Sequence, residues 1–131
     1  MIDYGVRYEH YCADLTRCFI LDKDNSKTKE YEKLQDICYE IVDSLPNLRT
    51  GKDVAKLSEK LIAKAKFPKL IHSIGHGVGL DVHELPRLGM KSKDRITAGA
   101  MLAIEPAFYG KNYGMRFEET ICFNGKRARI L

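Results

Sequence analysis

The amino-acid sequence predicts an α+β fold in which a mainly antiparallel sheet is backed by two helices. Stretches rich in β-branched and aromatic residues lie at both ends of the chain, at residues 1–21 and from Pro68 onward. Two amphipathic stretches with helical periodicity lie between them. The length of 131 residues is typical of one domain, so we expect a single domain over residues 1–131.

The helices are predicted from their apolar periodicity and their end signals. The extended residues 1–21 lead into the turn-forming segment DKDNS. A first helix follows, with Ser26 or Thr28 as N-cap and Pro46 as stop signal, and a second covers residues 52–66. The apolar residues expected to face the sheet are Leu34, Ile37, Cys38, Ile41, Val42 and Leu45 in the first helix, and Val54, Leu57, Leu61 and Ile62 in the second.

The remaining strands are predicted in the C-terminal half. The segments KLIHSI, AMLAIEPAFY and MRFEETICF have strand character, and RARIL is a candidate for a last short strand. Together with residues 1–21, these segments are sufficient for a mainly antiparallel sheet.

Composition argues against several classes of function. The net charge of +4 includes Lys52, Lys56, Lys60 and Lys64, whose i, i+4 spacing indicates a solvated helix face, so we expect no nucleic-acid partner. No apolar run is long enough to span a bilayer and no signal peptide is recognised, so we expect no membrane partner. The four cysteines form no CxxC pair, which favours reduced thiols and a cytoplasmic protein.

Two pairs of acidic residues stand out in the predicted hairpins. A turn at residues 8–9 would place Asp3 directly across from Asp14, and a turn inside YGKNYG would place Glu105 across from Glu118. Like charges opposite one another destabilise a sheet, and acids in apolar surroundings are paired, neutralised or bound to metal. Two acid pairs of the same geometry favour metal.

Three of the four histidines lie in HSIGHGVGLDVHELPRLG, residues 72–89, together with closely spaced glycines. In an extended segment His72, Ile74 and His76 would share one face, whereas His83 would point to the other. The glycines must therefore bend the chain if the histidines converge.

Four carboxylates and one imidazole would balance the charge of two divalent ions. This oxygen-rich donor set suits Mn²⁺, Co²⁺, Fe²⁺ or Zn²⁺. Two such ions generate hydroxide at neutral pH and polarise a carbonyl, which indicates hydrolysis, most naturally of an amide.

The motifs DYGVRYEHYCADLTR, HSIGHGVGLDVHELPR, AIEPAFY and GMRFEET resemble, in order and spacing, those of the pita-bread metallopeptidases. The similarity is greatest to the Xaa-Pro dipeptidase (prolidase) and Xaa-Pro aminopeptidase branch. It implies a pita-bread catalytic domain and hydrolysis, by a metal-bridging hydroxide, of the peptide bond on the N-terminal side of proline. Methionine aminopeptidase and a non-catalytic binding module or inactive fragment are the alternatives.

The resemblance also implies the metal ligands. Asp3 would bind one metal ion, while His76 and Glu105 would complete the site of the other. Asp14 and Glu118 would bridge the two ions. The resemblance favours Mn²⁺ or Co²⁺ as the two divalent ions.

Other roles follow from the same resemblance. His83 would bond the scissile carbonyl or the tetrahedral intermediate, and Glu118 would act as proton shuttle. His72 would orient the substrate, Arg87 would hold the carboxylate of a short Xaa-Pro peptide, and Arg116 would support Glu118.

The chain departs from the family in one respect. Family members have a substantial segment before the position of Asp3, so we expect this chain to be the C-terminal portion of the catalytic domain, whether as a fragment or as a short form whose own activity is open. We expect an exposed sheet edge and an uncovered apolar face, and hence a homodimer or aggregation.

Overall fold

A computed structural model of the chain describes residues 1–21 and 25–131. The predicted turn DKDNS falls largely on residues 22–24, outside the described residues. The secondary structure comprises β1 (Ile2–Tyr8), β2 (Tyr11–Arg17), α1 (Asn25–Ser44), η1 (Leu45–Asn47), α2 (Gly51–Lys64), β3 (Gly75–Gly77), β4 (Glu84–Leu88), β5 (Ala100–Ile104), β6 (Ala107–Tyr109), β7 (Gly114–Arg116), β8 (Glu119–Phe123) and β9 (Ala128–Ile130).

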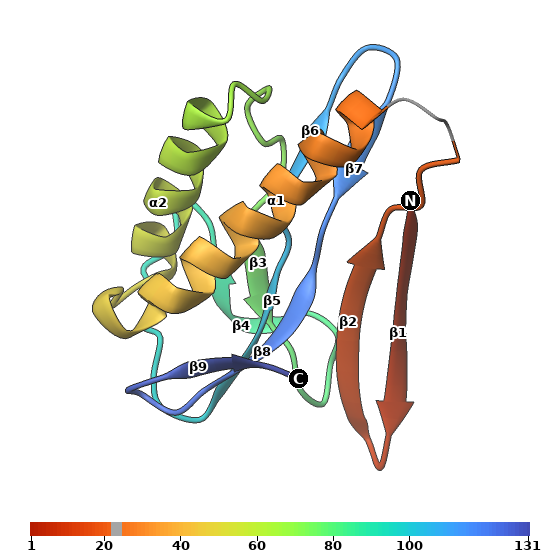
Figure 1. The fold of residues 1–131 in the computed structure, drawn as a ribbon. Coiled ribbons are helices and arrows are strands. Elements are labelled where there is room, and N and C mark those ends of the chain that lie inside the picture. The colour runs from red at the N-terminus through yellow and green to blue at the C-terminus, as the bar shows by residue number, and fades with distance from the viewer. Residues whose placement is uncertain (22–24) are drawn as a thin grey trace.

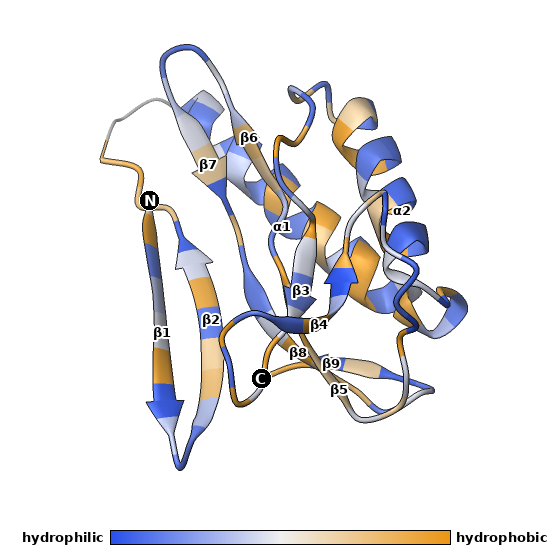
Figure 2. Cartoon of the chain, turned by 180° about the vertical axis from the view of Figure 1, so that it is seen from behind, coloured by the Kyte–Doolittle hydropathy of each residue, from blue (hydrophilic) through white to orange (hydrophobic). Residues whose placement is uncertain are grey.

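The strands form an antiparallel five-stranded sheet, β4-β3-β5-β8-β9, and two two-stranded sheets, β1-β2 and β6-β7. Figure 1 shows α1 and α2 side by side on one face of the five-stranded sheet, with the β1-β2 hairpin beside β8. Figure 2 gives the view from behind, in which the hairpin again lies at the outside of the molecule. The predicted α+β class is confirmed.

Both predicted helices are present, and their ends follow local chemistry. Thr50 caps α2 through a capping box, in which its hydroxyl accepts from the Asp53 N–H while the Asp53 carboxylate accepts from the Thr50 N–H. The first helix is described from Asn25, so Ser26 and Thr28 lie within it and neither is its N-cap. Helix α1 gives way to η1 around Pro46, as the stop signal predicts.

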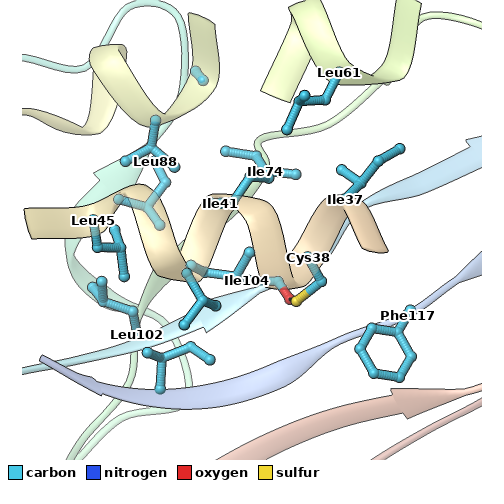
Figure 3. Close-up of a cluster of buried hydrophobic side chains, with 14 of the residues drawn as sticks. Ile37, Cys38, Ile41, Leu45, Leu61, Ile74, Leu88, Leu102, Ile104 and Phe117 are labelled. Carbon is cyan, nitrogen blue, oxygen red and sulfur yellow. The ribbon is translucent and has the colours of Figure 1, made fainter. Parts of the chain in front are cut away.

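The hydrophobic core lies between the helices and the sheet. Figure 3 shows Ile41 of α1 and Leu45 of η1 packed over Leu102 and Ile104 of β5. The predicted apolar stripe of α1 is buried throughout, whereas Leu57 of α2 is only partly buried. Burial of each such side chain stabilises the fold by about 1.5–3 kcal/mol relative to exposure.

Strand alternation divides the five-stranded sheet into two chemically different faces. Leu102 and Ile104 of β5 point into the core under the helices. Ala103 lies between them and therefore points to the opposite face, where the register pairs it with His76 of β3 and Thr120 of β8. This second face carries the polar residues.

The first hairpin has a different register from the predicted one. Asp3 pairs with Thr16, and Gly5 pairs with Asp14, so Asp3 and Asp14 are diagonal rather than opposite neighbours. The turn is Glu9-His10, one residue further along, and both residues have positive φ. Such turns usually carry Asn-Gly, so Glu-His gives little sequence signal and the predicted register was wrong.

The second acid-bearing hairpin has the predicted register. Ile104 pairs with Glu119 and Ala107 pairs with Arg116, so both ladders share one alignment. Glu105 and Glu118 lie between these two ladders, opposite one another in that alignment.

The histidine segment differs from the prediction in two ways. KLIHSI is not a strand, and Ile74 packs in the core rather than sharing a face with His76. The chain bends at residues 79–83, where Gly79 alone of the three predicted glycines lies, whereas Gly75 and Gly77 form strand β3 with His76. They are needed because a Cβ on either would collide with a carbonyl oxygen of the neighbouring strand, Ala103 or Leu85.

No helix in the described part of the chain has the length and apolar character needed to cross a bilayer.

Candidate metal centre

Five side chains converge on the polar face of the sheet. They are Asp3 of β1, Asp14 of β2, His76 of β3, Glu105 directly after β5 and Glu118 directly before β8. Possible ligand atoms of Asp3, Asp14 and Glu118 lie within 4.8 Å of one another, and so do those of His76, Glu105 and Glu118. Glu118 belongs to both groups. These five residues are the predicted ligand set.

The hairpin brings its two acids to the site despite the error in the predicted register. The actual register differs by two residues, and side chains two residues apart point to the same face of a strand. Asp3 and Asp14 therefore face the same way, as in the predicted pairing.

The hairpin is attached to the sheet beside the site by β2 and β8. The Glu118 N–H donates to the Thr16 carbonyl at 3.2 Å, and the Asp14 N–H donates to the Thr120 hydroxyl at 3.0 Å. That hydroxyl donates back to the Asp14 carbonyl at 2.8 Å. These bonds fix the hairpin against β8 and against Glu118, which immediately precedes β8.

His76 presents a nitrogen lone pair to the acids. Its Nδ1 lies 2.9 Å from the Gly77 carbonyl oxygen, which is the geometry of an N–H donor. Its Nε2 is then unprotonated in the neutral ring and lies 3.7 Å from Asp14 Oδ2 and 3.9 Å from Glu105 Oε1. Burial lowers the pKa of His76, which favours the neutral ring.

Arg116 lies among the carboxylates. Its Nη2 forms an ion pair with Asp3, and its Nη1 and Nε lie 3.7 Å and 3.9 Å from Glu105 Oε2 and Glu118 Oε2. Its Nε also donates to Thr16 Oγ1 at 2.9 Å. Although burial opposes the charged guanidinium, the neighbouring Asp3 leaves the pKa of Arg116 raised.

The two glutamates are strongly perturbed. Burial, followed by the charge of Glu118, raises the pKa of Glu105 to about 8. Burial also raises the pKa of Glu118 to about 7, against the hydrogen bond from Thr16. Crowded acids with raised pKa values are a feature of functional sites, because their ionised form needs additional positive charge.

The donor set fits divalent ions. It combines four carboxylates with an imidazole lone pair, which is the oxygen-rich chemistry that Mn²⁺, Co²⁺, Fe²⁺ and Zn²⁺ accept. One guanidinium supplies a single positive charge against four carboxylates. The residues present therefore fit divalent metal ions.

The predicted substrate-binding residues differ in position. The His83 ring centroid lies 4.2 Å from that of His76, and one of its nitrogens lies within 4.8 Å of ligand atoms of Asp14 and His76. His72 Nδ1 lies 3.6 Å from Glu105 Oε2. Arg87 is exposed, and its backbone N–H donates to Asp94.

A cavity of about 570 Å³ opens over the metal centre. Its lining includes all five candidate ligands, together with His83 and Arg116. Leu80, Val82, Tyr4 and Val6 add apolar surface to its wall. His72 and Arg87 are not among the described residues that line this cavity.

Three supporting residues were missed at the sequence level. Thr16 Oγ1 donates to Glu118 Oε2 at 2.5 Å, Thr120 holds the Asp14 backbone, and the Tyr109 hydroxyl lies 2.9 Å from His72 Nε2. Thr16 lies two residues after Asp14 and so shares its face, which is a signal that strand parity contains.

The α+β fold and the carboxylate-rich centre on one face of its sheet define the class of the chain, which is that of metal-binding proteins with the pita-bread fold. The model of metallopeptidase family M24 matches residues 1–124, and the chain therefore belongs to metallopeptidase family M24. The predicted resemblance to its prolidase branch is confirmed by the relatives that follow.

Similarity to individual proteins extends over the whole chain. It is 36% identical over 134 residues to a Xaa-Pro dipeptidase from Pyrococcus horikoshii, which covers 100% of this chain and 38% of that protein. The crystal structure of the prolidase from the same organism matches with a TM-score of 0.86 and 33% identity, over 98% of this chain and 38% of that one. The chain thus spans about 38% of the length of the curated relative it matches.

A methionine aminopeptidase from Rickettsia prowazekii also matches, with a TM-score of 0.80 and 15% identity, over 98% of this chain and 61% of that one. At this identity the likeness shows the fold alone.

Proposed function

We propose that this chain is the metal-bearing part of a peptidase that hydrolyses the peptide bond on the N-terminal side of proline in short peptides. The observation that carries the proposal is the convergence of Asp3, Asp14, His76, Glu105 and Glu118 on one cavity. The Xaa-Pro dipeptidase and prolidase among its relatives support this substrate class.

The chain's own residues have distinct roles in the proposed reaction. Asp3, Asp14, His76, Glu105 and Glu118 would hold two divalent ions, most favourably Mn²⁺ or Co²⁺, with Fe²⁺ and Zn²⁺ as alternatives. When bound, the ions would activate water and polarise the carbonyl of the scissile bond.

Proton transfer is proposed for Glu118. Its carboxylate lies in the cavity among the other candidate ligands, so it could accept a proton from the attacking water and pass it on. Thr16 and Arg116 contact it at 2.5 Å and 3.9 Å, which favours a fixed carboxylate orientation.

Substrate orientation is proposed for the histidines. The side chain of His83 is exposed at the cavity and has a ring nitrogen close to His76, so it could donate to the carbonyl oxygen as negative charge develops. The Nδ1 atom of His72 lies 3.6 Å from Glu105 Oε2 and its Nε2 atom lies 2.9 Å from the Tyr109 hydroxyl, and His72 is proposed to orient the peptide. The role of Arg87 in holding a substrate carboxylate is proposed from the family resemblance alone.

The test is metal-dependent hydrolysis by the purified chain. With Mn²⁺ or Co²⁺ bound at two ions per chain, we expect cleavage of Xaa-Pro dipeptides and slower cleavage of Met-Ala. His76→Ala is expected to abolish cleavage, whereas His10→Ala, in the β1-β2 turn, should not. Two bound ions without hydrolysis of Xaa-Pro would support the non-catalytic alternative, and faster cleavage of Met-Ala would support a methionine aminopeptidase.

The cytoplasm is the proposed location. All four cysteines, Cys12, Cys18, Cys38 and Cys122, are free thiols in the structure, which is typical of a reducing compartment.

A further inference from the structure

Two consecutive residues of β2 hold the N–H, the carbonyl and the carboxylate of Glu118. The Glu118 N–H donates to the Thr16 carbonyl at 3.2 Å, and its carboxylate Oε2 accepts from Thr16 Oγ1 at 2.5 Å. The Glu118 carbonyl oxygen accepts from Arg17 Nη1 at 2.6 Å. Thr16 therefore bonds two of these groups and Arg17 bonds the third.

The guanidinium of Arg17 contacts three consecutive residues, of which Glu118 is the middle one. Its Cζ lies 4.6 Å from the ring centroid of Phe117, its Nη1 donates to the Glu118 carbonyl, and its Nη2 donates to Glu119 Oε1 at 2.6 Å. Its Nη1 also donates to the Thr16 carbonyl at 3.0 Å. Because a guanidinium is planar and its donors have fixed directions, one side chain holds residues 117–119 against β2.

Arg17 reaches this segment from the side of the helices. Thr16 and Arg17 are neighbours in β2, so their side chains point to opposite faces. The Phe117 ring beneath the guanidinium is buried and packs edge-on against Tyr31 of α1. Arg17 is not among the described residues that line the metal-centre cavity. It can therefore act on the metal centre only through the residues that it holds.

The carboxylate of Glu119 fixes the direction of the guanidinium. The side chain of Glu119 is only 6% exposed, and a buried charge needs a partner of opposite sign. Arg17 Nη2 is that partner, at 2.6 Å. With one nitrogen bound to a buried carboxylate, the adjacent nitrogen is directed at the Glu118 carbonyl.

The main chain at Glu118 depends on this support because it lies between regular strands. Strand β7 ends at Arg116, and β8 begins only at Glu119. The Glu118 N–H bonds to the hairpin rather than to β5. Since the direction of the Cα–Cβ bond follows from the positions of the backbone N and C atoms, bonds to the N–H and to the carbonyl determine where the carboxylate lies.

We propose that Arg17 is a positioning residue of the metal centre, which holds the main chain of Glu118 and thereby places the carboxylate shared by both ligand groups. This role rests on the proposed function only in that Glu118 is taken as a metal ligand. Replacing Arg17 removes no ligand atom, so metal binding should weaken rather than disappear. Loss of residues that orient ligands typically lowers metal affinity about 10–100-fold.

Substitutions at Arg17 test this role in the whole chain. Arg17→Met keeps an unbranched side chain and removes every donor, so calorimetric titration with Mn²⁺ should give an affinity about 10–100-fold below that of the wild-type chain. Arg17→Lys keeps the charge beside Glu119 but has one nitrogen instead of a planar pair, so its affinity should lie between the two. The visible absorption of bound Co²⁺ should change in both variants, because it depends on coordination geometry.

Val54→Ala is the control for a general loss of stability. Val54 is fully buried in α2 and is not among the described residues that line the cavity. The variant should unfold at a lower urea concentration and still bind Mn²⁺ with wild-type affinity. An equal loss of affinity in Val54→Ala and Arg17→Met would overturn the role of Arg17, because affinity would then follow stability alone.

Wild-type Mn²⁺ affinity and Co²⁺ absorption in a folded Arg17→Met chain would also overturn it. If circular dichroism shows that Arg17→Met is unfolded, Arg17→Lys decides, and wild-type affinity in that variant would overturn the role. A wild-type chain that binds neither Mn²⁺ nor Co²⁺ would refute the ligand set itself, and with it the proposed function. The two failures are therefore distinguishable, and neither measurement depends on hydrolysis.

Discussion

Thr16 donates a hydrogen bond from Oγ1 to Oε2 of Glu118 at 2.5 Å, across the junction between the hairpin and the sheet. Thr16 is fully buried and also accepts from Arg116 Nε at 2.9 Å. Its hydroxyl thus connects the carboxylate shared by both ligand groups to the guanidinium that pairs with Asp3.

Replacing this hydroxyl should weaken the metal centre. Thr16→Val keeps the shape of the side chain but leaves a buried carboxylate oxygen without its donor, which should cost about 1–3 kcal/mol of stability. Loss of such a supporting contact typically lowers metal affinity about 10–100-fold. Urea denaturation and calorimetric titration with Mn²⁺ measure the two effects. Thr97→Val, at an exposed position, is the control, and equal behaviour of the two variants would refute the role of Thr16.

The metal-free chain should lose stability as pH rises. Burial and then Glu118 raise the pKa of Glu105 to about 8, against an ordinary value of 4.5. Between these values the unfolded chain releases a proton that the folded chain retains, so the contribution to the free energy of unfolding falls throughout that window and levels off above it.

The readout is a comparison with Glu105→Gln. His72 and His76, whose pKa values burial lowers, act in the opposite direction below about pH 6.5, so the difference between the wild-type chain and Glu105→Gln isolates the glutamate. Denaturation at pH 5, 7 and 9 should show a smaller loss in the variant. Glu40→Gln, on the exposed side of α1, should behave as the wild-type chain. An unchanged pH profile in Glu105→Gln would contradict this assignment.

Removing a candidate ligand should separate metal binding from folding. Asp14→Asn keeps the size of the side chain and removes one of the crowded negative charges, so the metal-free variant should be at least as stable as the wild-type chain. Its melting temperature should no longer rise with added Mn²⁺ or Co²⁺, because stabilisation by a ligand depends on its affinity. Asp43→Asn makes the same change at an exposed helical position and should retain the metal-induced rise. A full rise in Asp14→Asn would remove Asp14 from the ligand set.

Much of the site could be predicted because it depends on strand parity rather than on register. The error in pairing Asp3 with Asp14 amounted to two residues, which leaves both side chains on one face. The correct turn, Glu9-His10, needs positive φ at residues that seldom adopt it, so no local sequence rule identifies it.

The histidine segment was less predictable because its conformation depends on contacts with distant strands. Ile74 leaves the face expected from alternation and enters the core, and β4, Glu84–Leu88, was not expected to be a strand. The glycines suggested a bend, yet the role of Gly75 and Gly77 depends on the carbonyl groups of β4 and β5, which sequence spacing does not reveal.

Gly77 should therefore be essential to the position of His76. A Cβ at Gly77 would collide with the Leu85 carbonyl carbon and oxygen, which are backbone atoms that cannot move without shifting β4. Gly77→Ala is expected to lower stability by about 1–3 kcal/mol, as overpacking does, and to weaken metal binding by displacing the adjacent histidine. Urea denaturation and calorimetric titration with Mn²⁺ test both effects. Gly89→Ala is the matched control, because its Cβ would meet only the Ser73 Cβ at 3.6 Å, an ordinary contact. Wild-type stability and metal affinity in Gly77→Ala would show that β3 tolerates a side chain there and that close backbone approach does not position His76.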